Sequence, residues 1–241
     1  MWAIRNFDES SPFPEYGVMS RNGVFALLLL ASAGWLFPQA VSMDADVQYA
    51  PNLKLDIYHP PNQGASSRPA VILIHGGGWT SFDKSTMRGM GEFLARAGYV
   101  AFAVDYRLFH GSNNRWPAQL DDVQRAVRWV RANAAKYGVD PDHIGAFGHS
   151  AGAQLACLLG MENTRDNSDS SLAKYSSRVQ AVVDTSGPVD FTRDQAADGV
   201  AFLTAFLGAD YKQSPKCVAG CLTGVSCEQD ERAVPDSARH C

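Results

Sequence analysis

The stretch IGAFGHSAGAQLACLL, residues 144–159, indicates how this 241-residue chain folds. Its first half, up to His149, is apolar and small, as expected of a strand buried on both faces of a sheet. Its second half is rich in small apolar residues and predicts a helix. Between them, residues 148–152 read G-x-S-x-G, a pattern that places a serine on a sharp strand-to-helix turn with its hydroxyl exposed. Ser150 is therefore predicted to be a nucleophile, which needs a base to take its proton.

Strand-like and helix-like patterns alternate on both sides of this stretch. Continuous apolar runs predict strands buried on both faces, and apolar residues at helical spacing predict amphipathic helices. This alternation indicates right-handed crossovers and an α/β fold with a mainly parallel sheet and helices on both faces. The predicted strands lie within residues 47–59, 70–75, 99–106, 143–149 and 179–187, and the predicted helices at residues 84–98, 117–137 and 150–161.

Three local details refine this pattern. The strand within residues 47–59 alternates apolar and polar side chains, so we expect it to be half-exposed. Gly98 and Gly138 follow predicted helices and are expected to end them. Residues 163–177 are rich in Ser, Asp and Asn and are expected to form a surface loop.

Composition excludes several classes of protein. Hydrophobic residues make up 46% and charged residues 19% of the chain, which is typical of a globular protein rather than a disordered one. A length of 241 residues is enough for one substantial core. The net charge of -4 and the lack of a basic run argue against nucleic acid as a partner, because phosphates need lysine and arginine clusters.

The N-terminal region has the features of an export signal. Arg21 precedes an apolar run at residues 24–37, and Ala40-Val41-Ser42 is a small-x-small cleavage pattern. The apolar run is shorter than a membrane-spanning helix requires. We therefore expect residues 1–42 to be an N-terminal extension and signal peptide, Met19 to be the start of that signal, and the mature protein to be secreted or periplasmic. An uncleaved membrane anchor is the alternative.

A glycine-rich segment, His75-Gly76-Gly77-Gly78, follows a predicted buried strand. Hydrolysis of an ester passes through a tetrahedral oxyanion, which is stabilised by backbone N–H groups that point at the oxygen. Glycine allows the backbone to come close, because it has no Cβ. A loop at this position reaches the carboxyl edge of the sheet, where Ser150 is also expected.

Four motifs together support a family resemblance: IHGGGW, DYRL, GHSAG and SGPVDF occur in this order. They resemble the α/β-hydrolase superfamily, and within it secreted esterases and lipases with an HGGG oxyanion loop, of the hormone-sensitive-lipase-like and feruloyl- or acetylxylan-esterase-like kinds. The resemblance covers residues 47–208. It implies that the N–H groups of Gly77, Gly78 and Ala151 form the oxyanion hole. It also implies that His75 and His149 support their own motifs rather than serve as the base.

No motif of the sequence identifies the acid and the base of the catalytic triad. The superfamily order is serine, then acid, then histidine, and the only histidine after Ser150 is His240. Asp230 is the corresponding weak candidate for the acid. No strand-like run precedes either residue, so the last strands of the fold are expected to be missing.

The end of the chain, residues 211–241, differs from the α/β-hydrolase core expected at residues 43–210. It contains Cys217, Cys221, Cys227 and Cys241 without regular spacing, whereas Cys157 is expected to be a buried core thiol. Three interpretations remain open: an out-of-frame or truncated end of an esterase gene, a disulfide-stapled replacement, or a zinc site formed by the first three tail cysteines.

These observations predict a serine hydrolase that acts on carboxylic esters without a metal or an organic cofactor. The expected partner is a small-molecule or polysaccharide-linked ester substrate, with no nucleic acid and no stable membrane span after signal cleavage. The alternatives are a catalytically inactive, truncated pseudoenzyme or binding module that retains the pocket, and an amidase or formamidase of the same fold.

Overall fold

The computed structural model describes residues 40–61, 67–188 and 197–207, all of which belong to one compact unit, Gln39–Cys241. Residues 1–39 of the predicted extension and signal peptide, and the cysteine-containing tail, lie outside the described residues. The described elements, in chain order, are β1 (Ser42–Ala50), β2 (Leu53–His59), β3 (Arg68–Ile74), the 3-10 helix η1 (Lys84–Met87), α2 (Arg88–Arg96), β4 (Val100–Val104), α3 (Ala118–Ala132), α4 (Ala134–Tyr137), β5 (Val139–His149), α5 (Ala151–Met161), β6 (Ala181–Thr185) and α6 (Ala197–Leu207).

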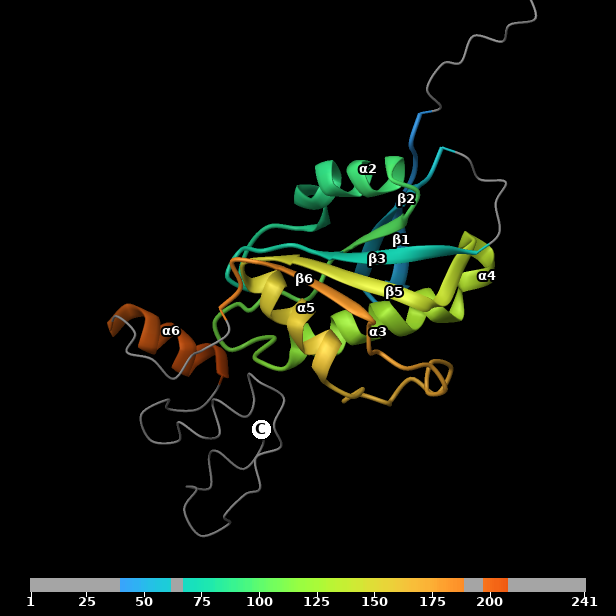
Figure 1. The fold of residues 1–241 in the computed structure, drawn as a ribbon. Coiled ribbons are helices and arrows are strands. Elements are labelled where there is room, and N and C mark those ends of the chain that lie inside the picture. The colour runs from blue at the N-terminus through green and yellow to red at the C-terminus, as the bar shows by residue number, and fades with distance from the viewer. Residues whose placement is uncertain (1–39, 62–66, 189–196, 208–241) are drawn as a thin grey trace, which may run out of the picture. The chain divides into compact units, whose positions relative to one another are not determined.

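The strands form one six-stranded sheet in the order β1-β2-β4-β3-β5-β6. β4, β3, β5 and β6 run parallel, whereas β2 is antiparallel to both of its neighbours, β1 and β4 (Figure 1). The predicted mainly parallel sheet is confirmed. β1 was not predicted, because most of its side chains are exposed and its sequence has no apolar pattern. It begins at Ser42, the last residue assigned to the predicted extension.

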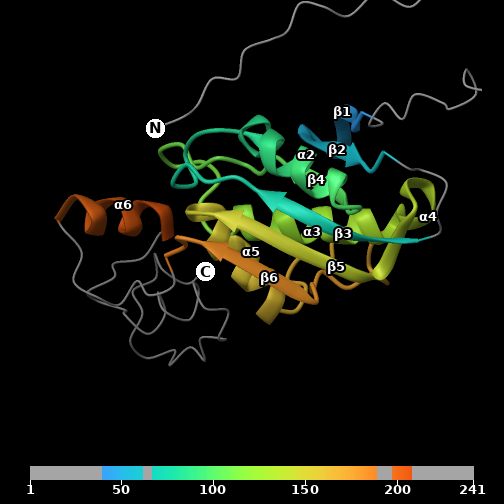
Figure 2. The same ribbon diagram turned by 45° about the horizontal axis from the view of Figure 1, so that its top comes forward.

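Helices cover both faces of the sheet, as expected. α2 lies on one face, and α3 and α5 lie on the other (Figure 2). On the α2 face, Gly91 allows close contact with the ring of Tyr58, because a Cβ on Gly91 would lie 2.4 Å from that ring. Gly98 and Gly138 adopt positive φ angles of 95° and 64° after α2 and α4, which confirms their predicted role in ending helices.

β2 is more buried than its alternating sequence suggests. The expectation of a half-exposed strand was wrong, because Asp56 is only 6% exposed and Tyr58 is 1% exposed. The Asp56 carboxylate lies 3.0 Å from the Lys84 ammonium, which compensates for the loss of water. A polar residue therefore occupies a buried position because a residue from η1 neutralises it.

β6 forms the opposite edge of the described sheet and is less buried than predicted. Val183 at its centre is 52% exposed, so the expectation of another fully buried strand was wrong. The described residues place no further strand beside it. α6 was not predicted as a helix, although its Phe206 is fully buried and contacts the rings of Trp79, Phe109 and Trp116.

The loop at residues 163–177 lies on the surface, as predicted. Arginine side chains of α3 bind it through hydrogen bonds and an ion pair. The Arg128 guanidinium donates to the carbonyls of Asp166 and Leu172 at 2.6 and 3.1 Å. Arg125 forms an ion pair with Asp166 at 2.9 Å. None of the described helices is both long enough and apolar enough to cross a membrane.

Candidate active site

Ser150 lies on a strained turn between β5 and α5. Its backbone angles are φ 52° and ψ −120°, a conformation that side-chain-bearing residues rarely adopt. β6 holds this turn in place, because the Ser150 N–H donates to the Thr185 carbonyl at 2.9 Å and the Thr185 hydroxyl donates to the Gly148 carbonyl. The structure thus has the strand–turn–helix context that the G-x-S-x-G motif predicts.

The two glycines of this motif are required by close packing. A Cβ on Gly148 would lie 2.2 Å from the Gly152 carbonyl oxygen, and a Cβ on Gly152 would lie 2.2 Å from that of Ile74. Real Cβ atoms do not approach other atoms so closely. The first turn of α5 therefore packs directly on the ends of β3 and β5, which positions Ser150 at the carboxyl edge of the sheet.

The glycine-rich loop after β3 passes beside Ser150. A Cβ on Gly76 would lie 3.2 Å from the Ser150 Cβ and 2.9 Å from the His149 carbonyl oxygen. Gly77 and Gly78 follow with positive φ angles of 102° and 58°. The structure therefore brings together the nucleophile and the loop that the sequence predicts to stabilise its oxyanion.

Three backbone N–H groups of this region have no protein acceptor among the described residues. They belong to Gly77, Gly78 and Ala151, the residues predicted to form the oxyanion hole. The Ala151 N–H is at the first position of α5, where a helix leaves its N–H groups unsatisfied and carries partial positive charge. These groups are available to bind a negatively charged oxygen.

His75 is directed toward its own loop. It is 1% exposed, and its Nδ1 lies 2.8 Å from the Gly76 carbonyl oxygen, to which it must donate because a carbonyl only accepts. Burial lowers the pKa of His75, which favours the neutral ring. The ring stacks on Tyr106 with centroids 4.2 Å apart.

The other described histidines have different partners. His59 lies 3.0 Å from Asp44, and His143 lies 2.8 Å from Asp140. His149 is exposed at the end of β5. Among the described residues, no histidine side chain is hydrogen-bonded to Ser150, and Asp230 and His240 lie outside them. The described residues also contain no group of three potential metal ligands, and the tail cysteines lie outside that search.

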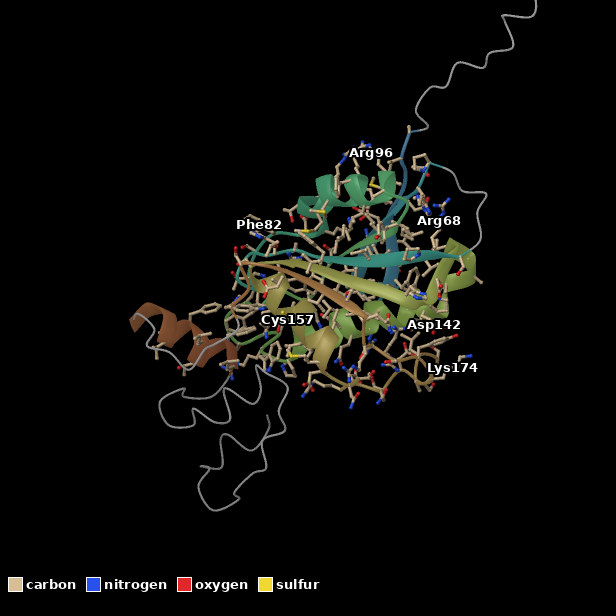
Figure 3. All side chains as sticks on the ribbon, in the orientation of Figure 1. Arg68, Phe82, Arg96, Asp142, Cys157 and Lys174 are labelled. Atoms are coloured by element: carbon tan, nitrogen blue, oxygen red, sulfur yellow. The ribbon has the colours of Figure 1, made fainter. Side chains whose placement is uncertain are left out.

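Aromatic side chains support the far side of the glycine-rich loop. Trp79 follows Gly78 at φ 61° and stacks on Phe206 of α6 with centroids 4.9 Å apart. The Phe206 carbonyl accepts from the Trp116 N–H at 3.0 Å. Phe82, at the end of the sheet where β3 ends, is 64% exposed at φ 69° (Figure 3). Three residues with positive φ angles therefore lie at one edge of the sheet: Trp79, Phe82 and Ser150.

Two features of the site were not anticipated correctly. Cys157, labelled in Figure 3, is partly exposed rather than buried. Its thiol donates to the Asp184 carboxylate at 3.4 Å. Burial and this carboxylate raise the pKa of Cys157 to about 11. The sequence also did not indicate that Thr185 contacts the turn of Ser150 or that Tyr106 contacts the glycine-rich loop. The only feature that could have indicated these contacts is that each residue lies at the end of a strand.

The fold and the strained serine turn define the class of the protein as an α/β-hydrolase. The model of the BD-FAE family matches residues 55–223, which is more than half of the chain. The chain belongs to this family.

Two curated relatives are esterases of Mycobacterium tuberculosis. The chain is 35% identical over 159 residues to LipM, described as a probable carboxylic ester hydrolase, and 32% identical over 153 residues to the esterase LipQ. These matches cover 64% and 61% of this chain but only 36% of either relative. The chain therefore spans about a third of the length of these relatives.

Solved structures show the same fold. The butyrate-bound esterase Est2 of Thermogutta terrifontis matches with a TM-score of 0.60 at 31% identity, over 76% of this chain and 66% of Est2. A bifunctional GH43-CE protein of Bacteroides eggerthii matches with a TM-score of 0.64 at 30% identity, over 74% of this chain and 26% of that protein.

Proposed function

We propose that this chain supplies the nucleophile and the oxyanion hole of a secreted carboxylic ester hydrolase. The observation that carries the proposal is the convergence, at one edge of the sheet, of Ser150 on its strained turn with the glycine-rich loop. The unoccupied N–H groups of Gly77, Gly78 and Ala151 lie in these two segments. An arrangement with a serine hydroxyl beside free backbone donors is suited to acyl transfer.

The chemistry follows from these groups. Ser150 Oγ attacks the carbonyl carbon of the ester and forms a new C–O bond, while its proton passes to a base. Negative charge develops on the carbonyl oxygen, where the three N–H groups stabilise it. The intermediate then collapses and expels the alcohol, and water hydrolyses the acyl-enzyme. Neutral His75 donates from Nδ1 to the Gly76 carbonyl, which leaves Nε2 as its acceptor, and Nε2 has no hydrogen-bond partner among the described residues.

The substrate class is a carboxylic ester with a short acyl group. Est2, whose structure contains butyrate, supports this choice. A polysaccharide-linked ester is the second candidate, because another similar structure is described as a truncated carbohydrate esterase from gut microbiota and has a TM-score of 0.62 at 28% identity.

Turnover of p-nitrophenyl butyrate by the purified chain tests the proposal. We expect turnover that Ser150→Ala abolishes, with a loss on the order of 10⁶-fold if the base is present. His240→Ala tests whether the only histidine after Ser150 is that base. If wild type and Ser150→Ala hydrolyse the ester equally slowly, the chain is a pseudoenzyme or a binding module. Faster cleavage of p-nitrobutyranilide than of the ester favours the amidase alternative.

Export is a separate part of the proposal. The charged, apolar and small-residue pattern of residues 19–42 supports it. N-terminal sequencing of the protein released from a bacterial host is expected to begin close to Met43. Recovery of the intact chain from the cytoplasmic fraction contradicts export.

A further inference from the structure

Three successive carbonyl groups in the glycine-rich loop accept hydrogen bonds. They are the carbonyls of His75, Gly76 and Gly77. The single cis peptide bond among the described residues is Trp116–Pro117, so the peptides of this loop are trans. In a trans peptide, the carbonyl of one residue and the N–H of the next point in opposite directions. A donor that holds one carbonyl therefore fixes the direction of the next N–H.

Tyr106 holds the first two carbonyls. Its hydroxyl lies 3.0 and 3.1 Å from the carbonyl oxygens of His75 and Gly76, which share its single hydrogen. The Gly76 carbonyl also accepts from His75 Nδ1 at 2.8 Å. The side chain is 3% exposed and stacks on the His75 ring, so it has little freedom to move. The carbonyl of Gly76 precedes the N–H of Gly77, one of the two loop donors in the proposed oxyanion hole.

Ser81 and Thr80 hold the third carbonyl. The Ser81 hydroxyl and N–H donate to the Gly77 oxygen at 2.9 and 3.1 Å, and the corresponding groups of Thr80 lie at 3.2 and 3.0 Å. Four donors therefore converge on one carbonyl. The N–H of the same peptide, that of Gly78, points the opposite way.

We propose that Tyr106 and Ser81 are positioning residues that orient the N–H groups of Gly77 and Gly78 toward the substrate oxyanion. This inference rests on the proposed function. Neither hydroxyl acts on substrate directly. Each helps to fix one peptide plane, Tyr106 together with His75 at the Gly76 carbonyl and Ser81 together with Thr80 at the Gly77 carbonyl. The donors are thereby aligned before charge develops on the substrate.

The sequence provides a selective way to observe these two peptides. Residues 76–78 contain the only consecutive glycines of the chain. In protein labelled with carbonyl-¹³C, ¹⁵N-glycine, a two-dimensional HNCO spectrum therefore contains two cross-peaks. One joins the Gly77 N–H to the Gly76 carbonyl, and the other joins the Gly78 N–H to the Gly77 carbonyl. Each ¹³C frequency reports the hydrogen bonding of its carbonyl.

The two variants are expected to produce opposite patterns. Tyr106→Phe removes one hydroxyl and should move the Gly76 carbonyl frequency upfield while the Gly77 carbonyl changes little. Ser81→Ala should do the reverse. With p-nitrophenyl butyrate, each variant should lower kcat about ten- to a hundredfold and leave KM near the wild-type value, because the donors act mainly on the transition state. Ser81 is exposed, so its variant should fold even if Tyr106→Phe does not.

Two control variants remove buried hydroxyl hydrogen bonds elsewhere. Tyr49→Phe removes a bond to the Asp105 carbonyl, and Ser177→Ala removes a bond of 2.8 Å to the Thr164 hydroxyl. Both should lower stability without moving either glycine cross-peak or kcat. Unmoved cross-peaks in Ser81→Ala, or moved cross-peaks with unchanged kcat, overturn the positioning role. Equal rates for wild type and Ser150→Ala instead overturn the proposed function, whatever the cross-peaks show.

Discussion

The two glycine motifs that meet at Ser150 use glycine for different physical reasons. Gly148 and Gly152 have no positive φ but lie so close to neighbouring backbone that a Cβ on either would come within 2.2 Å of a carbonyl oxygen. Gly77 and Gly78 adopt φ angles of 102° and 58°, and the space beside Gly78 is open. The first pair is needed for packing. The second pair is needed for conformation, and Gly77 is also closely packed, because a Cβ there would lie 2.1 Å from the Ser81 carbonyl oxygen.

This difference separates stability from catalysis. The packing pair lies between β3, β5 and α5, where backbone cannot move without disturbing the core. Gly77 and Gly78 lie in a loop outside the sheet. A substitution there should mainly change the direction of an N–H group rather than disturb the core. Substitutions in the first motif should therefore affect folding most, and substitutions in the second should affect turnover most.

Gly152→Ala should have the largest effect. Its Cβ would lie 2.2 and 2.4 Å from the carbonyl oxygens of Ile74, the last residue of β3, and of His75, which follows it. We expect a loss of about 4 kcal/mol or more in the free energy of unfolding, which leaves little folded protein. Guanidinium unfolding followed by circular dichroism measures this loss. A wild-type midpoint means that the predicted collision does not exist.

Gly77→Ala should have a smaller effect on stability and a large effect on turnover. The new Cβ would lie 2.1 Å from the Ser81 carbonyl oxygen at a strained φ. Because the obstructing Ser81 carbonyl belongs to a loop rather than to the sheet, we expect a loss of about 1–3 kcal/mol in stability. Turnover of p-nitrophenyl butyrate should fall about a hundredfold, as expected when an oxyanion donor is lost. Equal loss in Gly77→Ala and Gly152→Ala contradicts the division into two kinds of glycine.

Gly78→Ala should be milder than Gly77→Ala. Its φ of 58° is within the left-handed region, which costs a residue with a Cβ about 1–2 kcal/mol, but no atom obstructs the Cβ. The N–H keeps its direction, because the Gly77 carbonyl remains held by Ser81 and Thr80. We expect turnover to stay within about tenfold of wild type. A loss as large as that of Gly77→Ala shows that the space beside Gly78 is required by substrate.

Gly89→Ala should change stability in the opposite direction and by the smallest amount. This glycine is in α2, has no positive φ, and has no atom within 4 Å of the position of a Cβ. Alanine is favoured over glycine in a helix by up to about 1 kcal/mol, so the melting temperature should rise. Ester turnover should not change, and a destabilised protein contradicts the prediction.

The sequence indicated the sheet, its helices and the two motifs because these depend on local patterns. Apolar runs identified β3, β4 and β5, since a strand covered on both faces needs apolar side chains at every position. The G-x-S-x-G motif located the strained turn, because the neighbouring glycines mark the closest approach of α5 to the sheet. Prediction failed where the structure of a segment depends on another part of the chain that contacts it. β1 is a strand because β2 pairs with it, and Asp56 is buried because Lys84 neutralises it.

The sequence by itself determined that Ser150 and the glycine-rich loop both follow parallel strands and so reach the same edge of the sheet. Only the tertiary structure decided how the loop is oriented. The donors that hold its carbonyls come from Tyr106, about thirty residues away in sequence, and from a turn that folds Ser81 back onto Gly77. Hydrogen bonds between such residues depend on where two loops meet after the sheet has formed, which no local pattern of side chains specifies.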